Sequence, residues 1–129
     1  RDENYSVMCV KHNHVPVEDK KFLGATQTRY EKKNWSSVML FNCNKCRTLT
    51  PEYVNNASGL DLHRFNWLES EDLIGEIPNR WNHLVDYDPQ LPTDQISNLH
   101  YTVGGPYFDE YKNCSYNSEW QKEKENTFC

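Results

Sequence analysis

The chain has 129 residues, of which 36% are hydrophobic and 26% charged, and its formal net charge is −5 at pH 7. No block of Lys and Arg is long enough to bind a nucleic-acid backbone, and no apolar run reaches the roughly 18 residues of a membrane helix. These features predict one domain without a transmembrane segment or nucleic-acid partner, and the absence of a signal-peptide pattern predicts a cytoplasmic protein.

The predicted elements begin with a strand over residues 5–10, which are mostly apolar. A polar stretch over residues 16–33 follows as a loop. Residues 36–41 form a continuous apolar run, which predicts the most deeply buried strand, placed centrally in the sheet. A helix should begin at residues 50–52, because Thr50 can cap the free amides and proline suits the first helical position. We expect that helix to end by residue 59.

The second half of the chain has shorter predicted elements. Residues 60–68 carry apolar side chains at helical spacing, and residues 73–84 contain a short strand and an extended turn. Residues 96–103 predict a last strand, and residues 118–124 predict a terminal helix capped by its serine. Strands and helices interleave, so the sequence predicts an α/β fold with a mixed sheet flanked by helices.

The five cysteines do not form a disulfide framework, because their number is odd and one close pair is present. That pair, Cys43 and Cys46, has the C-x-x-C spacing of half a zinc site or of a redox pair. No second pair follows at zinc-finger spacing. Ordinary reduced cysteine is the interpretation that the spacing favours, and a zinc site stays open as an alternative.

His100 is the candidate metal ligand that the pattern singles out. It lies near the end of a predicted strand, where α/β sheets bind ligands, and imidazole is a common ligand of Mn-like metals. The glycines that follow, Gly104 and Gly105, would leave room for phosphate oxygens. A partly buried strand histidine is the other interpretation, and local spacing does not decide between them.

Three segments resemble motifs of retaining glycosyltransferases of the glycogenin and bacterial galactosyltransferase type. Residues 34–42 resemble F-N-(S/A)-G-V-M-x-F-N, and residues 73–82 resemble L-P-x-x-(W/Y)-N. Residues 100–107 resemble the closing motif H-(Y/F)-x-G-x-x-K-P-W, shortened and without its lysine. The whole chain is also similar to bacterial proteins described as glycosyltransferases.

The resemblance implies a partial GT-A fold, with residues 1–129 as a single domain that is the C-terminal, acceptor-side half of a larger enzyme. The implied function is transfer of a sugar from a nucleotide-sugar donor to a glycan or other acceptor. A Mn or Mg ion would neutralise the leaving phosphates, with His100 as one ligand. The family's D-x-D motif falls upstream of Tyr5, so the chain alone should be inactive. Asp86-Tyr87-Asp88 has the letters of that motif but lies in a predicted surface loop.

The resemblance also suggests site residues. Asp61 lies near the family's carboxylate-bearing helix and is the predicted catalytic residue. Sugars are held by aromatic faces and short polar side chains, although each aromatic taken singly is more typical of a core residue. The predicted substrate-binding residues are Trp35, Asn42, His63, Trp67, Trp81, Asn82, Gly104 and Gly105.

Two further hypotheses belong to other classes. One is a small zinc- or glycan-binding module without catalysis, in which the C-x-x-C cysteines or the aromatic side chains form the site. The other is a homodimer that forms through an exposed strand edge, since an unpaired edge is a template for another strand.

Overall fold

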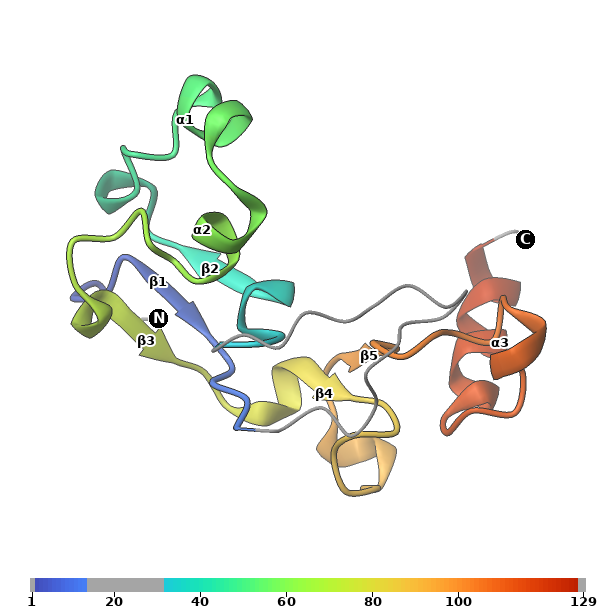
Figure 1. Cartoon of the computed structure of the whole chain (residues 1–129). Coiled ribbons are helices and arrows are strands. Elements are labelled where there is room, and N and C mark those ends of the chain that lie inside the picture. The colour runs from blue at the N-terminus through green and yellow to red at the C-terminus, as the bar shows by residue number, and fades with distance from the viewer. Residues whose placement is uncertain (1, 14–31, 128–129) are drawn as a thin grey trace. The chain divides into compact units, whose positions relative to one another are not determined.

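The computed structural model describes residues 2–13 and 32–127, which belong to two compact units. Of the described residues, unit 1 comprises 2–13 and 32–81, and unit 2 comprises 82–127. Each unit contains a small sheet and short helices (Figure 1). The predicted mixture of strands and helices with a small mixed sheet is confirmed, and a single domain over the whole chain stays a prediction.

Unit 1 is built on a three-stranded sheet in the order β2-β1-β3. The central strand β1 (Val7–Cys9) runs antiparallel to β2 (Met39–Phe41) and parallel to β3 (Ile74–Glu76) (Figure 1). All three residues of β1 are buried. The predicted strand over residues 5–10 is therefore confirmed, and it forms the centre of the sheet.

The strand β2 lies at an edge of this sheet. Its residues Met39, Leu40 and Phe41 keep 38%, 43% and 38% of their surface exposed. The prediction of a central, buried strand over residues 36–41 is wrong, and its first part is a 3-10 turn, η2 (Trp35–Ser37). A continuous apolar run is typical of strands covered on both faces, but the position of a strand depends on which neighbours pair with it.

Two short helices follow. In α1 (Pro51–Asn56), the Oγ1 of Thr50 accepts the N–H of Tyr53 at 3.1 Å, and proline occupies the first turn, as predicted. The next helix, α2 (Gly59–His63), is shorter than the predicted residues 60–68. It cannot continue beyond Arg64, because Phe65 has a φ of 61°, in the left-handed region.

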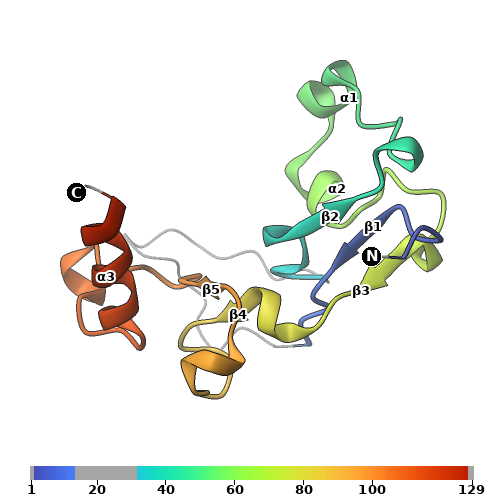
Figure 2. The same ribbon diagram turned by 180° about the vertical axis from the view of Figure 1, so that it is seen from behind.

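The core of unit 1 joins the sheet to the segment after α2. Phe65 and Trp67 pack against Val7 and Cys9 of β1 and Ile74 of β3. The ring centroid of Trp67 lies 6.1 Å from that of Phe65 and 6.3 Å from that of Phe41. Both helices contribute to the cover of this core (Figure 2). The partly buried residues packed against it are Trp35, Cys46, Leu49, Tyr53, Leu62 and Leu68.

Unit 2 contains a two-stranded parallel sheet, β4 (His83–Leu84) and β5 (Leu99–His100), and the helix α3 (Asn117–Thr127). The predicted strand over residues 96–103 is thus reduced to two residues. The predicted terminal helix is present, but its capping by Ser118 is wrong. That serine lies inside the helix and its Oγ donates to the carboxylate of Glu119 at 2.7 Å.

Short 3-10 segments connect these elements. Besides η2 they are η3 (Cys43–Lys45), η4 (Glu71–Leu73), η5 (Asn79–Asn82), η6 (Thr93–Gln95) and η7 (Asp109–Tyr111).

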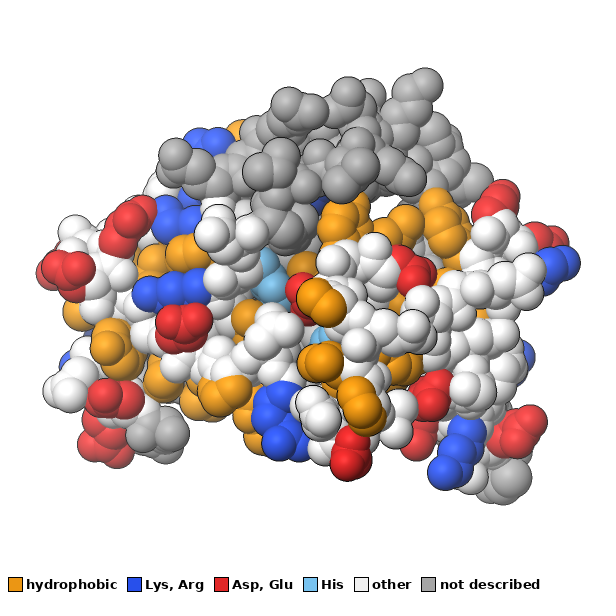
Figure 3. Space-filling view, turned by 90° about the horizontal axis from the view of Figure 1, so that it is seen from below, with side chains coloured by type: hydrophobic (Ala, Val, Ile, Leu, Met, Phe, Trp, Pro, Cys, Tyr) orange, Lys and Arg blue, Asp and Glu red, His pale blue; other side chains and the backbone are white. Residues whose placement is uncertain are grey.

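Among the described residues, no helix is both long enough and apolar enough to cross a membrane. Acidic and basic side chains are interspersed on the face seen in Figure 3.

Candidate functional site

The residues predicted to form one site fall in both units. The predicted catalytic residue, Asp61, is in unit 1, whereas the predicted metal ligand, His100, is in unit 2. Of the predicted substrate-binding residues, those in unit 1 are Trp35, Asn42, His63, Trp67 and Trp81, and those in unit 2 are Asn82, Gly104 and Gly105.

The carboxylate of Asp61 is held by the start of its own helix. It accepts the Oγ–H of Ser58 at 2.6 Å and the Nδ2–H of Asn66 at 2.9 Å, while its backbone N–H donates to Ser58 at 3.1 Å. The hydrogen bond from Ser58, followed by that from Asn66, lowers the pKa of Asp61. The geometry makes this aspartate part of the α2 cap and keeps it ionised.

We expect Ser58→Ala to raise the pKa of Asp61 towards its usual value, because the largest stabiliser of the ionised form is lost. A depressed carboxyl pKa adds stability above the unfolded-state pKa, and this stability is lost as the pH falls through the folded-state pKa. Titration of the Asp61 carboxyl carbon by NMR measures the shift. An identical titration curve in wild type and variant would contradict the capping role.

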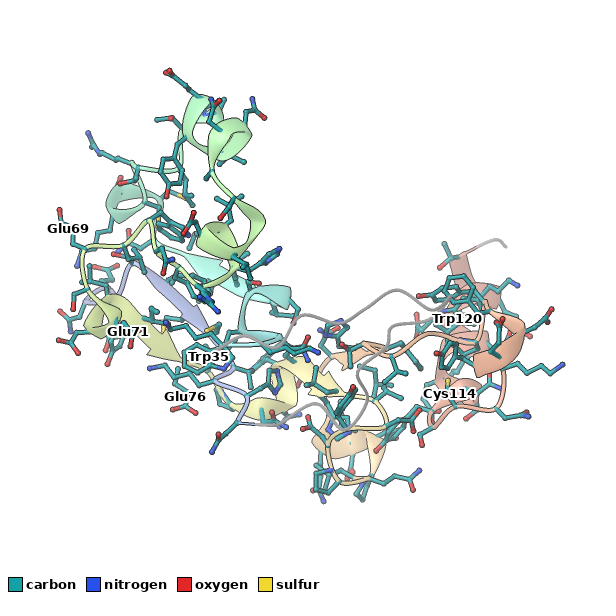
Figure 4. All side chains as sticks on the ribbon, in the orientation of Figure 1. Trp35, Glu69, Glu71, Glu76, Cys114 and Trp120 are labelled. Carbon is teal, nitrogen blue, oxygen red and sulfur yellow. The ribbon has the colours of Figure 1, made fainter. Side chains whose placement is uncertain are left out.

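The predicted residue His63 contacts Ser36, the chain neighbour of the predicted residue Trp35. The Oγ of Ser36 lies 2.6 Å from the Nδ1 of His63, which joins η2 to α2. Next to it, Trp35 donates its Nε1–H to the carbonyl of His12 at 2.7 Å, and the ammonium of Lys11 lies 5.8 Å from its ring centroid. Trp35, which Figure 4 labels, therefore links η2 to the end of residues 2–13.

The other predicted residues of unit 1 differ in exposure. Trp67 is a core residue whose Nε1–H donates to the carbonyl of Leu62 at 3.3 Å, so its ring is not available as a sugar platform. The backbone N–H of Asn42 donates to the carbonyl of Ser6 at 2.9 Å and extends the pairing of β2 with β1. Trp81 is 50% exposed and is the one tryptophan among the exposed large hydrophobic residues described.

In unit 2, β4 and β5 bring Asn82 and His100 together. The Nδ1 of His100 lies 3.1 Å from the Oδ1 of Asn82, which is fully buried. An amide oxygen only accepts hydrogen bonds, so Nδ1 carries the proton in this arrangement. Burial lowers the pKa of His100. The histidine is a half-buried strand residue, as the second interpretation of the sequence proposed.

The described residues do not complete a metal site around His100. Over residues 2–13 and 32–127, no group of three or more His, Cys, Asp or Glu side chains could hold a metal ion. Mn²⁺ and Mg²⁺ prefer several oxygen ligands, and the hydrogen-bond partner of His100 is an amide in place of a carboxylate. The described residues therefore give no support to metal binding at His100, and a metal held with ligands outside them stays a prediction.

We expect the pKa of His100 to lie below the usual histidine value, because burial disfavours the imidazolium. The folded-state pKa is depressed. The free energy of unfolding is therefore highest above the unfolded-state pKa, and it decreases as the pH falls from there through the folded-state pKa. NMR titration of the imidazole Hε1 checks this. A pKa at or above the usual histidine value would contradict the buried environment.

Gly104 and Gly105 are buried where aromatic rings approach the backbone. A Cβ on Gly104 would overlap the ring of Tyr111, and one on Gly105 would overlap the ring of Tyr107. Neither glycine has a φ in the left-handed region. Tyrosine rings thus fill the space beside these glycines. Close packing against the rings explains why neither position carries a side chain.

In the Asp86-Tyr87-Asp88 segment, Asp88 closes a turn onto Leu84, whereas the Oδ1 of Asp86 accepts the backbone N–H of Ser115 at 3.4 Å. The Oδ2 of Asp88 accepts the backbone N–H of Leu84 at 2.8 Å and lies 3.9 Å from the Nδ1 of His83. His83 is buried, its ring meets the edge of Tyr116, and neither ring nitrogen has a hydrogen-bond partner. Sequence analysis did not single out His83, because a histidine beside apolar residues gives no local signal of burial.

Unit 2 also contains a groove of about 710 Å³ between α3 and the segment from η6 to β5. Sequence analysis missed it, since its residues lie on segments far apart in the chain. A tryptophan on an otherwise polar helix, Trp120, was the available signal (Figure 4). The lining residues are Thr93, Ile96, Ser97, Asn98, Leu99, Tyr101, Ser118, Glu119, Trp120, Lys122 and Glu123.

The two aromatic residues of the groove are held in place by their neighbours. The hydroxyl of Tyr101 donates to the carbonyl of Tyr116 at 2.7 Å. Burial, with smaller contributions from Cys114, Glu119 and Asp86, raises the pKa of Tyr101 to about 12. The ring centroid of Trp120 lies 5.8 Å from that of Tyr107. Each ring therefore contacts a neighbour within unit 2.

The chain was compared with known proteins. It is 47% identical over 129 residues to the curated Arabidopsis thaliana protein named Protein CDI, in an alignment that covers 96% of the chain. The same alignment covers 49% of Protein CDI, so the chain spans about half the length of this relative. No family model matches the chain, and no solved structure matches it.

These findings correct the resemblance on which the predicted enzyme rested. The curated relative is a plant protein whose name does not describe a glycosyltransferase, and no model of a glycosyltransferase family matches. The identification of the chain as a GT-A glycosyltransferase related to bacterial enzymes is therefore wrong. Metal-dependent sugar transfer loses its support with that identification.

Proposed function

We propose that the chain is a non-catalytic saccharide-binding module whose site is the groove of unit 2. The observation that supports this proposal is the presence of two aromatic residues, Tyr101 and Trp120, together with short polar side chains in the lining of one groove. A sugar ring has apolar C–H faces and a rim of hydroxyls. It therefore needs an aromatic surface for its faces and small polar groups for its edge.

The polar groups of the groove suit hydroxyl ligands. Thr93 and Ser97 carry hydroxyls, Asn98 carries both a donor and an acceptor, and Ser118, whose O–H donates to Glu119, can still accept a hydrogen bond. Apolar side chains from Ile96 and Leu99 complete the lining. Such a set can exchange hydrogen bonds with a neutral sugar without leaving a charged group unpaired.

The charges of the groove argue against a phosphate-bearing ligand. Glu119 and Glu123 are acidic, and Lys122 supplies the one basic group of the lining. A diphosphate would place two negative charges beside this acidic helix face, where like charges repel. We therefore propose a neutral oligosaccharide as the ligand class.

A second hollow, in unit 1, fits a saccharide less well. Its one aromatic lining residue, Tyr53, packs against the core of that unit, and its carboxylate Asp61 already accepts two side-chain hydrogen bonds. The lining residues are Thr48, Thr50, Glu52, Tyr53, Asn56, Ala57 and Asp61.

The test is a titration of the chain with neutral hexaoses of glucose, mannose and xylose by calorimetry and tryptophan fluorescence. We expect at least one to bind, and Trp120→Ala to raise its Kd roughly tenfold or more, because stacking and apolar burial are lost. Asn98→Ala, which keeps the aromatic platform, should raise the Kd by a smaller factor.

Trp81→Ala is the matched control, because it removes an exposed tryptophan that does not line the groove. Its Kd should equal that of the wild type. Binding that survives both Trp120→Ala and Asn98→Ala, or tighter binding of a nucleoside diphosphate than of every hexaose, would contradict the proposal. Absence of binding by all three hexaoses would also count against it.

A further inference from the structure

The C-x-x-C pair of unit 1 lies on one turn of 3-10 helix. Cys43 is the first residue of η3, and the backbone N–H of Cys46 donates to the carbonyl of Cys43 at 3.4 Å. A 3-10 helix has about three residues per turn and rises about 2 Å per residue, so positions i and i+3 eclipse one another about 6 Å apart. That separation falls within the Cα–Cα range of disulfides, about 4.4–6.8 Å.

The two thiols differ in exposure. Cys43 is exposed, whereas Cys46 is half-buried against the core of unit 1, and both are free thiols. Burial raises the pKa of Cys46, and the nearby sulfur of Cys43 is the second cause of that rise. The pair therefore consists of an accessible thiol and a protected neighbour on the same face of the turn.

The surroundings of Cys46 tolerate the loss of its proton. Its Sγ–H donates to the carbonyl of Ser6 at 3.1 Å, and the same carbonyl accepts the backbone N–H of Asn42 at 2.9 Å. If the S–H is lost, this carbonyl keeps its backbone partner and is not left unsatisfied. The pairing between β1 and the end of β2 can thus survive oxidation of the thiol.

We infer that Cys43 and Cys46 form a reversible intramolecular disulfide by exchange with a low-molecular-weight disulfide such as oxidised glutathione. The Cys43 thiolate attacks one glutathione sulfur, which forms a mixed disulfide and releases one glutathione thiolate. Cys46, after losing its proton to water, attacks the Cys43 sulfur and releases the second glutathione thiolate. The protein loses two electrons and two protons, and one oxidised glutathione becomes two reduced ones.

The remaining described cysteines provide contrasts within the same chain. Cys9 is buried in β1, and burial raises its pKa to about 11, so it should not exchange. Cys114 is half-buried in unit 2, and burial raises its pKa as well. Neither occupies a C-x-x-C turn, and this makes Cys114→Ser a matched control.

Lys45 makes the disulfide easy to detect, because trypsin cleaves between the two cysteines. The full chain is equilibrated in buffers of varied reduced and oxidised glutathione, quenched with acid, alkylated and digested. We expect peptide 34–45 to stay joined to dipeptide 46–47 under oxidising conditions. An excess of reduced glutathione should separate them into two alkylated peptides. Cys114→Ser should give the same titration as the wild type.

Two variants separate the steps. In Cys46→Ser the second attack is impossible, so a glutathione adduct should accumulate on Cys43 under oxidising conditions. Cys43→Ser changes an exposed residue, so its circular dichroism spectrum should match that of the wild type. In this variant Cys46 should carry less glutathione adduct than Cys43 carries in Cys46→Ser. If Cys46→Ser does not fold, the glutathione titration of the wild type decides the matter, because the joined peptides must appear there and be absent from Cys43→Ser.

Several outcomes would overturn the inference. One is full alkylation of both cysteines in oxidising buffer, and another is a link that joins Cys43 to a different cysteine or to a second chain. Stoichiometric zinc that survives dialysis and shields both thiols from alkylation would assign the pair to metal binding instead. These results do not depend on the saccharide site, which lies in the other unit.

Discussion

Phe65→Ala is expected to destabilise unit 1 by about 3–5 kcal/mol, the range measured for removal of a buried aromatic side chain. Phe65 is 3% exposed and its ring packs against Trp67 and the strands β1 and β3. The cavity left behind cannot collapse easily, because Phe65 is fixed on both sides. Its N–H donates to Leu62 at 3.3 Å and its carbonyl accepts the N–H of Leu68 at 3.0 Å.

Urea unfolding followed by circular dichroism measures this effect, and hydrogen exchange of the β1 amides assigns it to unit 1. The control is Leu60→Ala in α2, where the side chain is 40% exposed and alanine is a good helix former. That variant should stay within about 1 kcal/mol of the wild type. Equal losses in the two variants would contradict a core centred on Phe65.

Gly75→Ala should destabilise the same unit by about 1–3 kcal/mol through overpacking. Gly75 is buried in β3, opposite Met8 of β1, and the ring of Tyr5 lies against it. A Cβ at this position would lie 2.5 Å from the Cδ2 of Tyr5 and 2.9 Å from the Cγ of Met8. Relief requires the Tyr5 ring to move, because these are inner atoms of the side chains.

Gly59→Ala is the matched control, because nothing lies within 4 Å of a Cβ built there. Gly59 is the first residue of α2, where alanine restricts the unfolded chain and favours the helix. We expect this variant to be as stable as the wild type or more stable by up to about 1 kcal/mol. Denaturant midpoints compare the two variants, and a stable Gly75→Ala protein would contradict the close packing of β1 and β3.

Local features of the fold could be predicted from the sequence. The start of α1 depended on Thr50, Pro51 and the amide of Tyr53, which are neighbours in the chain. The short apolar run at β1 also predicted its strand. Such features need contacts over three or four residues only, so the local chemistry is sufficient to determine them.

The candidate site could not be predicted in the same way. The aromatic residues that the sequence predicted to bind sugar were chosen from the resemblance to glycosyltransferases. One of them, Trp67, is a core residue because it packs against β1 and β3. Tyr101 and Trp120, which line the groove, are brought together by the packing of α3 in unit 2. Spacing along the chain carries no information about that packing.

The sequence by itself determined the Thr50 cap of α1, the location of β1 along the chain and the C-x-x-C spacing of Cys43 and Cys46, because each depends on residues adjacent along the chain. Only the tertiary structure decided that β1 is central, that β2 is an exposed edge and that His100 pairs with Asn82. Strand order and burial depend on which distant segments lose water together. That choice is made by the free energy of the whole packed unit and not by any single segment.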